Sequence, residues 1–151
     1  DTCIDVGANI GRYTLKMSKL VGNDGLVISF EPLTSAFEML TYFVNKGKYK
    51  NICLLNMAAS EKISIIDVET DYGNLNNPYL FETNTKTKIT NIQNRDNEKK
   101  LAIKIDSLDL PNKIKIIKID VEGHELEVCK GMTNLIYRDH PILIIENNDF
   151  I

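Results

Sequence analysis

The sequence lacks the cysteine patterns of disulfide-rich, redox and zinc-binding proteins. It contains only three cysteines, Cys3, Cys53 and Cys129, which are widely spaced and form no Cys-x-x-Cys pair. This spacing gives no indication of a redox motif or a zinc site. Each cysteine lies within an apolar pattern, which favours buried thiols in a reducing compartment.

Long apolar runs and an excess of positive charge are also lacking. No apolar run reaches the roughly 20 residues that span a bilayer, and no signal segment opens the chain. The formal net charge is −3 and the pI is near 5.4, which disfavours a broad basic face for nucleic acid or anionic lipid. We therefore expect a soluble, cytoplasmic protein with neither nucleic acid nor membrane as a partner.

The length fits one domain, because 151 residues with 43% apolar content can bury a core of ordinary globular size. The chain begins without methionine and already within an apparent strand. We interpret residues 1–151 as a single domain that is a piece of a longer protein.

Strand-like and helix-like segments alternate along the first third of the chain. Apolar runs predict strands at residues 2–6, 26–30 and 51–57, and helical spacing predicts helices at residues 11–21 and 33–47. Continuous apolar strands that alternate with helices indicate a parallel sheet covered on both faces. We predict an α/β fold with a Rossmann-like, doubly wound, mostly parallel sheet.

The rest of the chain is less regular. Residues 63–68 and 101–105 predict two strands, and the polar stretch at about 70–100 predicts a long loop, either a lid or a disordered segment. The strongest predicted strand covers residues 114–121 and is followed by one helix with an acidic first turn. A last strand at residues 142–145 would leave the sheet incomplete at its C-terminal end, after five parallel strands.

A glycine-rich turn, residues 5–11, follows the first predicted strand and opens the first predicted helix. Glycine tolerates positive φ and lets the backbone approach a ligand closely, and asparagine is also at ease in a left-handed turn. The helix N-terminus behind the turn favours a carboxylate or another anion. The turn therefore predicts a ligand site that contains Asp5, Gly7, Ala8, Asn9 and Gly11.

The spacing of this turn differs from the dinucleotide fingerprint, in which the third glycine allows close packing of helix and strand. Counted from Gly7, that third position holds the bulky Arg12. Asp5 can accept hydrogen bonds from an amino group but would repel a pyrophosphate. A nucleoside that carries an amino acid fits better, so S-adenosylmethionine (SAM) is the leading candidate and NAD the alternative.

Two further strand ends would contribute to the same site, because ligands bind at the carboxyl ends of parallel strands. Glu31 follows Gly7 at about the spacing at which an acid accepts hydrogen bonds from ribose hydroxyls, although a solvated carboxylate gives the same pattern. Pro32 ends that strand. Met57 and Ala58 follow the third strand and are either an adenine sandwich or plain packing residues.

Ionisable residues end the strongest predicted strand. Lys118, Asp120 and Glu122 alternate by two, so they project to one side if the strand continues, and His124 follows at the helix start. Asp120 would lie beside the amino group or methyl centre of SAM, and Glu122 or His124 would accept the proton of an acceptor hydroxyl. Glu146-Asn147, after the last strand, would complete the edge and could hold that hydroxyl.

Two other interpretations of these residues stay open. In a structural one, Lys118 pairs with Asp120 and the acids cap the helix. In a metal one, Asp120, Glu122 and His124 hold Mg²⁺ or another divalent ion.

Together these segments resemble the FkbM family of SAM-dependent methyltransferases. The likeness spans most of the chain, and its most family-specific part is the Lys-x-Asp-Val-Glu-Gly block. The resemblance implies a SAM-binding Rossmann-like sheet and O-methylation of a hydroxyl on a sugar, glycan or small natural product. The segments that carry it are residues 5–11, Phe30-Glu31-Pro32, Asn56-Met57-Ala58, Ile105-Asp106-Ser107-Leu108-Asp109 and residues 118–125.

We therefore predict a SAM-dependent methyltransferase with a small-molecule or glycan acceptor. The alternatives are an NAD-dependent oxidoreductase and a catalytically silent binding domain. The predicted catalytic residues are Lys118, Asp120, Glu122 and His124, the predicted cofactor-binding residues are Asp5, Gly7, Ala8, Asn9, Gly11, Glu31, Pro32, Met57, Ala58 and Asp120, and no metal is assigned.

Overall fold

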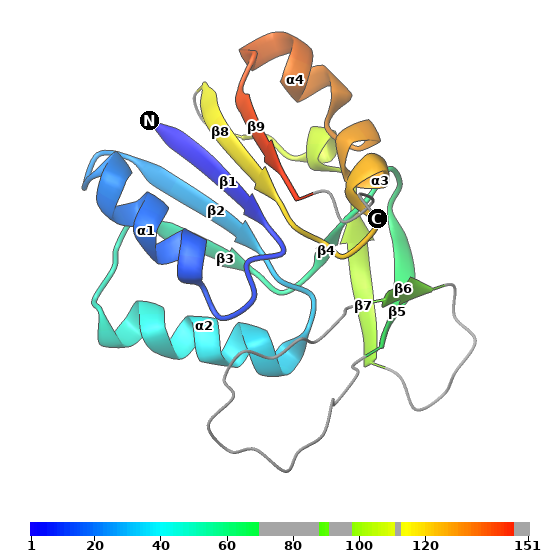
Figure 1. Cartoon of the computed structure of the whole chain (residues 1–151), viewed down its shortest axis with the longest axis horizontal. Helices are drawn as coiled ribbons and strands as arrows, with labels where there is room; N and C mark the ends of the chain where they lie inside the picture. The colour runs from blue at the N-terminus through cyan, green and yellow to red at the C-terminus, as the bar shows by residue number, and fades with distance from the viewer. Residues whose placement is uncertain (70–87, 91–97, 111–112, 147–151) are drawn as a thin grey trace.

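The computed structural model describes residues 1–69, 88–90, 98–110 and 113–146 (Figure 1). Most of the predicted loop at about 70–100 therefore lies outside the described residues. The elements in chain order are β1 (Thr2–Val6), α1 (Arg12–Val21), β2 (Leu26–Phe30), α2 (Thr34–Lys46), β3 (Ile52–Leu55), β4 (Ala58–Ala59), β5 (Ser64–Glu69), β6 (Lys88–Thr90), β7 (Glu98–Ile103), the 3₁₀ turn η1 (Ile105–Ser107), β8 (Ile114–Ile119), α3 (Glu125–Lys130), α4 (Thr133–Asp139) and β9 (Ile142–Ile145).

The main sheet has the strand order β3-β2-β1-β8-β9, and all of its strand pairs are parallel. Strand order reverses between β1 and β8, the kind of position at which such sheets bind ligands. This arrangement confirms the predicted α/β, Rossmann-like, mostly parallel fold.

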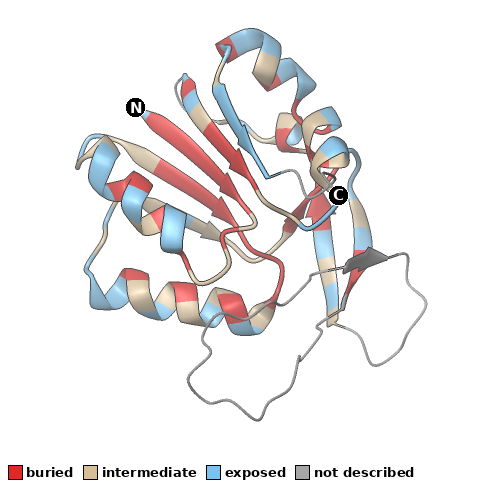
Figure 2. Cartoon of the chain, in the orientation of Figure 1, coloured by how far each residue is buried: buried red, intermediate tan, exposed pale blue. Residues whose placement is uncertain are grey.

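Helices cover both faces of the main sheet. Successive residues of a strand point to opposite sides, so each strand packs against helices on both faces. On β1, Cys3 packs with Met17 of α1, whereas Ile4 packs with Val128 of α3 and Leu135 of α4. β1 and β2 are almost wholly buried (Figure 2), whereas all four residues of β9 are exposed. The core therefore lies around β1, β2 and β8, beside the point where strand order reverses.

A second sheet, which the sequence patterns did not separate from the first, has the order β4-β7-β5-β6. β4 pairs in parallel with β7, and β5 pairs antiparallel with both β7 and β6. The predicted strand at residues 51–57 is therefore corrected: it ends at Leu55, and the chain enters the second sheet at Ala58. The predicted strand at 101–105 lies mostly within β7, which ends at Ile103.

The single helix expected after β8 is also wrong, because the chain breaks between α3 and α4. Gly131 ends α3 where a Cβ atom would lie 2.0 Å from the carbonyl oxygen of Ser60. The carboxylate of Asp106 then accepts hydrogen bonds from the backbone N–H groups of Asn134 and Leu135, both over 2.9 Å. A carboxylate at this place satisfies N–H groups that begin a new helix.

The three cysteines are free thiols. Only Cys3 is buried, while Cys129 is half-buried and Cys53 is exposed, so the expectation of three buried thiols is wrong for Cys53. Within the residues that the structure describes, every helix is too short or too polar to span a bilayer.

Candidate functional site

The glycine turn between β1 and α1 has the left-handed conformations that its sequence predicts. Gly7, Asn9 and Gly11 have φ values of 77°, 50° and 96°. A Cβ atom on Gly7 would lie 1.8 Å from the carbonyl oxygen of Asp120, and one on Gly11 would lie 2.4 Å from Cδ1 of Leu40. The turn needs glycine to pack against the end of β8 and against α2, as well as for any approach to a ligand.

A hollow opens beside this turn at the carboxyl ends of β1, β2 and β8, and we call it the first hollow. It encloses about 590 Å³ when the part open to solvent is included. It brings together eight of the residues predicted for the site. Its described lining consists of Val6, Gly7, Asn9, Phe30, Glu31, Pro32, Met57, Ala58, Ala59, Asp120, Val121 and Glu122.

Glu31 is the buried acid of the first hollow. Its Oε2 accepts a hydrogen bond from the backbone N–H of Asn9 over 2.7 Å, and its Oε1 accepts one from that of Leu33 over 2.9 Å. Burial raises the pKa of Glu31 to about 6, although these two N–H groups act to lower it. Each carboxylate oxygen has two lone pairs, so both can accept another hydrogen bond from a ligand.

Asn9 also carries an acceptor without a partner. Its side-chain Oδ1 is buried and accepts no hydrogen bond from the described residues. A buried amide oxygen without a donor is costly, and such groups are usually paired. Asn9 lines the first hollow, so a ligand N–H or O–H group would satisfy this oxygen once the side chain turns toward the hollow.

Three predicted cofactor-binding residues lie behind the turn and outside the described lining of the first hollow. Asp5 is fully buried in β1, and its Oδ2 accepts a hydrogen bond from the hydroxyl of Thr14 over 2.6 Å. Burial raises the pKa of Asp5 against the opposing effects of Lys118 and Thr14. Ala8 is buried in an apolar cluster, and Gly11 packs on α2. Their predicted contact with a cofactor stays a prediction.

Lys118 connects the end of β8 with β1 and the glycine turn. Its Nζ lies 3.0 Å from Oδ2 of Asp120 and 3.6 Å from Oδ1 of Asp5, and it donates a hydrogen bond to the carbonyl oxygen of Gly7 over 3.1 Å. It also lies 5.0 Å from the ring centroid of Tyr13. The Lys118–Asp120 pair of the structural interpretation is present, while the functional interpretation of these residues stays a prediction.

A second hollow lies on the other side of Asp120. Asp120 therefore lines both hollows, and Glu146, which follows β9, lines the second hollow with it. Burial acts to raise the pKa of Asp120, but hydrogen bonds with Glu146 and Lys118 outweigh it and lower that pKa, while the hydrogen bond and the charge of Asp120 raise the pKa of Glu146. The described lining consists of Tyr13, Lys118, Ile119, Asp120, Ile144, Ile145 and Glu146.

The predicted strand does not continue to Glu122, because β8 ends at Ile119. Glu122 and Gly123 form a left-handed turn with φ values of 54° and 96°. Oε1 of Glu125 closes the turn by accepting hydrogen bonds from the N–H groups of Val121 and Gly123, over 3.3 and 3.1 Å. The expected two-residue alternation is therefore wrong here, although the exposed Glu122 still lines the first hollow.

His124 lies apart from the described lining of both hollows. Its Nε2 is 3.0 Å from Oγ of Ser60, and its Nδ1 is 3.6 Å from Oε2 of Glu127. Burial lowers the pKa of His124 although neighbouring glutamates act to raise it. Among the described residues, no three histidine, cysteine, aspartate or glutamate side chains form a metal-binding group, so the metal interpretation finds no ligand set there.

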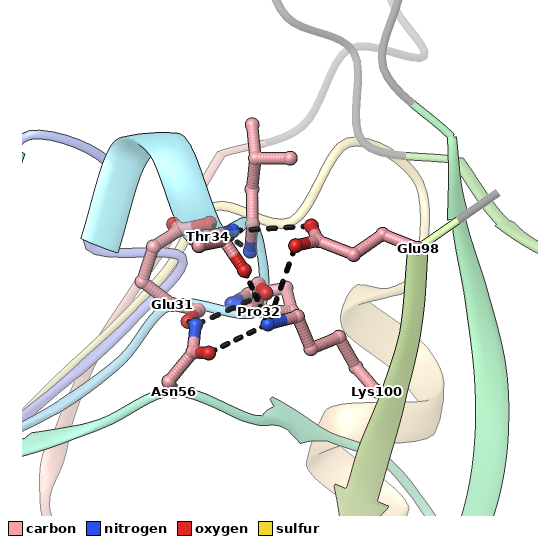
Figure 3. Close-up of polar contacts among 7 residues, drawn as sticks. Glu31, Pro32, Thr34, Asn56, Glu98 and Lys100 are labelled. Atoms are coloured by element: carbon pink, nitrogen blue, oxygen red, sulfur yellow. Dashed lines mark hydrogen bonds and ion pairs between the residues drawn. The ribbon is translucent and has the colours of Figure 1, made fainter. Parts of the chain in front are cut away.

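Sequence reasoning missed a polar network that holds the Glu31 segment from outside (Figure 3). Nζ of Lys100 donates hydrogen bonds to Oγ1 of Thr34 and to Oδ1 of Asn56, both over 2.6 Å. Nδ2 of Asn56 in turn donates to the carbonyl oxygens of Glu31 and Pro32, over 2.8 and 3.1 Å. Lys100 falls at the end of the stretch predicted as a loop, so only Asn56, from the family-like segment, could have indicated the network.

The fold and the first hollow define a Rossmann-like α/β domain. Its glycine turn and its buried acid flank the first hollow, where strand order reverses. A model of the FkbM methyltransferase domain matches residues 5–151, and the chain therefore belongs to the FkbM methyltransferase family.

Individual relatives agree with this family. The chain is 30% identical over 144 residues to the hexuronic acid methyltransferase AglP of Haloferax volcanii, and the match covers 95% of this chain and 55% of that protein. It also resembles the crystal structure of a methyltransferase FkbM from Methylobacillus flagellatus KT, with a TM-score of 0.68 and 19% identity over 96% of this chain and 32% of the other. The chain thus spans about half the length of the curated relative and a third of the solved one.

Proposed function

We propose that this chain forms the SAM-binding part of an enzyme that methylates a hydroxyl group of a sugar, glycan or small natural product. The observation that carries the proposal is the first hollow, where the glycine turn, the buried Glu31 and the unpartnered Oδ1 of Asn9 meet. Membership of the methyltransferase family supports the class of reaction, and the relative named for hexuronic acid supports a sugar acceptor.

The residues of the first hollow fit the parts of SAM. Both oxygens of Glu31 retain a lone pair for the ribose hydroxyls. Pro32, Met57 and Ala58 provide an apolar surface for the adenine ring. Oδ1 of Asn9 accepts a hydrogen bond from the ligand. Asp5 lies behind the turn and supports the site indirectly, through its ion pair with Lys118. SAM supplies a methyl group on a sulfonium sulfur, which is a good leaving group, so the protein mainly has to align the reactants and exclude water.

The second hollow is the proposed place of the acceptor. Its apolar wall includes Tyr13 and Ile144, and its polar end carries Asp120 and Glu146. Lys118 keeps Asp120 ionised at the border between the hollows. Glu146 holds the acceptor hydroxyl and, in its ionised form, takes the hydroxyl proton as the oxygen–carbon bond forms and the carbon–sulfur bond breaks. Asp120 raises the pKa of Glu146, which makes the ionised carboxylate the stronger base. This role differs from the one that the sequence suggested for Glu122 or His124.

Calorimetry with SAM and S-adenosylhomocysteine tests the cofactor assignment in the natural protein that contains this chain. We expect binding by the unmodified protein and loss of binding in Gly7→Arg and Glu31→Ala. Glu38→Ala, on the exposed face of α2, is the matched control and should bind normally. A folded protein that gives no heat with either ligand, but quenches NADH fluorescence on binding, would overturn the proposal in favour of an oxidoreductase.

A second assay tests the acceptor class. Transfer of a labelled methyl group from SAM to uronic acid glycosides and to neutral sugars should yield a labelled methyl ether with at least one of them. Transfer to neither, by a protein that binds S-adenosylhomocysteine, would overturn the sugar assignment and leave the cofactor assignment intact.

A further inference from the structure

The second sheet contacts the main sheet at the segment that carries Glu31. Leu33 and Ala36, around the start of α2, pack in one apolar cluster with Ala58 and Ala102 of the second sheet. The polar network of Lys100 lies beside this cluster and reaches the backbone on both sides of Pro32 (Figure 3). The second sheet therefore fixes the acid of the first hollow through apolar and polar contacts.

Glu98 and Lys100 lie on the same face of β7, because side chains two residues apart in a strand point the same way. Oε2 of Glu98 accepts a hydrogen bond from the backbone N–H of Thr34 over 3.1 Å, while Nζ of Lys100 lies 3.5 Å from Oε1 of Glu98 and 2.6 Å from Oγ1 of Thr34. The adjacent N–H, that of Leu33, is bound by Glu31 itself. Two acids, one from each sheet, thus bind neighbouring N–H groups at the start of α2.

Lys100 also fixes the orientation of the Asn56 amide. An ammonium group donates hydrogen bonds and cannot accept them, so Oδ1 of Asn56 must face Nζ of Lys100. Nδ2 must then face the carbonyl oxygens of Glu31 and Pro32, as observed. Without Lys100 the amide loses the partner that selects this orientation. The ammonium side chain is 12% exposed, so water replaces it poorly.

We propose that Lys100 is a positioning residue for the cofactor site, which acts through Asn56 and Thr34 to hold the carboxylate of Glu31 ready for the ribose hydroxyls. This inference rests on the proposed function, because it takes the first hollow as the SAM site. It assigns a role to the second sheet, which keeps Glu31 buried and correctly placed before the cofactor binds. Preorganisation of this kind increases affinity because fewer groups must be ordered on binding.

The test compares Lys100→Met with Lys99→Met in the natural protein. Lys99 is the neighbouring residue of β7, points to the opposite face and pairs with the buried Asp67 of β5. Both variants remove one positive charge and, among the described residues, one ion pair from the second sheet. Of the contacts described for the two lysines, only those of Lys100 reach the Glu31 segment. Lys99→Met therefore reports the effect of weakening this sheet alone. Asn56→Asp, which removes the amide donor to Glu31 and Pro32, provides a second variant if Lys100→Met fails to fold.

We expect Lys100→Met and Asn56→Asp to weaken S-adenosylhomocysteine binding by about tenfold and to raise the KM for SAM similarly, with kcat at saturating SAM nearly unchanged. Lys99→Met should bind within about twofold of the unmodified protein, because it leaves every contact of Glu31 in place. Equal binding by Lys100→Met and the unmodified protein, or equal losses in Lys100→Met and Lys99→Met, would overturn the proposal.

A carbon-13 NMR titration of the Glu31 carboxyl group gives a readout that needs no cofactor. Burial raises the pKa of this group to about 6, so a loosened segment that admits water should lower it toward its ordinary value of 4.5 in Lys100→Met and leave it unchanged in Lys99→Met. An unchanged pKa in Lys100→Met would overturn the positioning role. A different result is that the pKa of Glu31 falls as expected in Lys100→Met while neither the variants nor the unmodified protein bind S-adenosylhomocysteine. That result would overturn the proposed cofactor but not the positioning of Glu31 by Lys100.

Discussion

The backbone N–H of Asn9 donates a hydrogen bond to Oε2 of Glu31 over 2.7 Å, which joins the turn after β1 to the end of β2. The other oxygen of Glu31 binds the N–H of Leu33 at the start of α2. One buried carboxylate therefore connects two separate segments of the first hollow. Its protonation state should influence both the stability of the domain and the binding of a ligand.

Glu31→Gln should remove part of the pH dependence of stability. Burial raises the pKa of Glu31 to about 6, so the folded protein holds this proton where the unfolded chain has already lost it. The free energy of unfolding should therefore fall as pH rises from about 4.5 to about 6, by about 2 kcal/mol from this group, and stay level above that. Urea denaturation of both proteins across this range measures the difference, and parallel pH profiles would contradict the assignment.

Gly7→Ala should destabilise the domain more than Gly22→Ala, although both glycines have a positive φ of similar size, 77° and 71°. A Cβ atom on Gly22 meets nothing within 4 Å, so only the strained backbone costs energy, about 1–3 kcal/mol at its φ of 71° and ψ of −175°. On Gly7 the Cβ atom lies 1.8 Å from the Asp120 carbonyl oxygen, which forces β8 and the turn apart and raises the loss to about 3 kcal/mol or more. Thermal or urea denaturation checks this, and equal losses would contradict it.

Lys118→Met should be strongly destabilising because it leaves the fully buried Asp5 without its cation. We expect a loss of about 3–5 kcal/mol, the usual effect of breaking a buried ion pair. Lys130→Met is the surface control, since its pair with Glu61 spans 3.8 Å between half-exposed side chains and is worth about 0–1 kcal/mol. Similar denaturation midpoints for the two variants would show that Asp5 needs no partner.

Glu146→Gln should slow methyl transfer by about 100-fold or more, because it removes the proposed base. Binding of S-adenosylhomocysteine should persist, since Glu146 is absent from the described lining of the first hollow. His124→Gln is the matched variant and should stay within a few-fold of the unmodified rate. The reverse result, with His124 essential and Glu146 dispensable, would return the role of base to His124.

The parallel sheet and the ends of β1 and β2 were predictable because these two strands are almost wholly buried and read as mainly apolar runs, whereas β3 and β8 end two residues earlier than predicted. The positions of Gly7 and Glu31 follow from the ends of β1 and β2. The role of Asp5 could not be read in this way, since its partners Thr14 and Lys118 belong to other elements and no local pattern reports them.

Long-range contacts also explain the other misses. The break after α3 depends on the close approach of Gly131 to Ser60 and on the carboxylate of Asp106, neither of which affects helical periodicity. Lys100 belongs to β7, a strand that begins with polar residues. In the sequence these residues look like part of a loop, because the partners of Lys100 lie far away in the chain.

Because Asp120 borders both hollows, the proposed donor and acceptor are thermodynamically linked. A ligand that binds in one hollow and alters the charge or orientation of this carboxylate also changes the free energy of binding in the other hollow. This effect is reciprocal. An acceptor affinity measured without donor would therefore differ from the affinity in the ternary complex, and the donor affinity would differ by the same factor with and without acceptor.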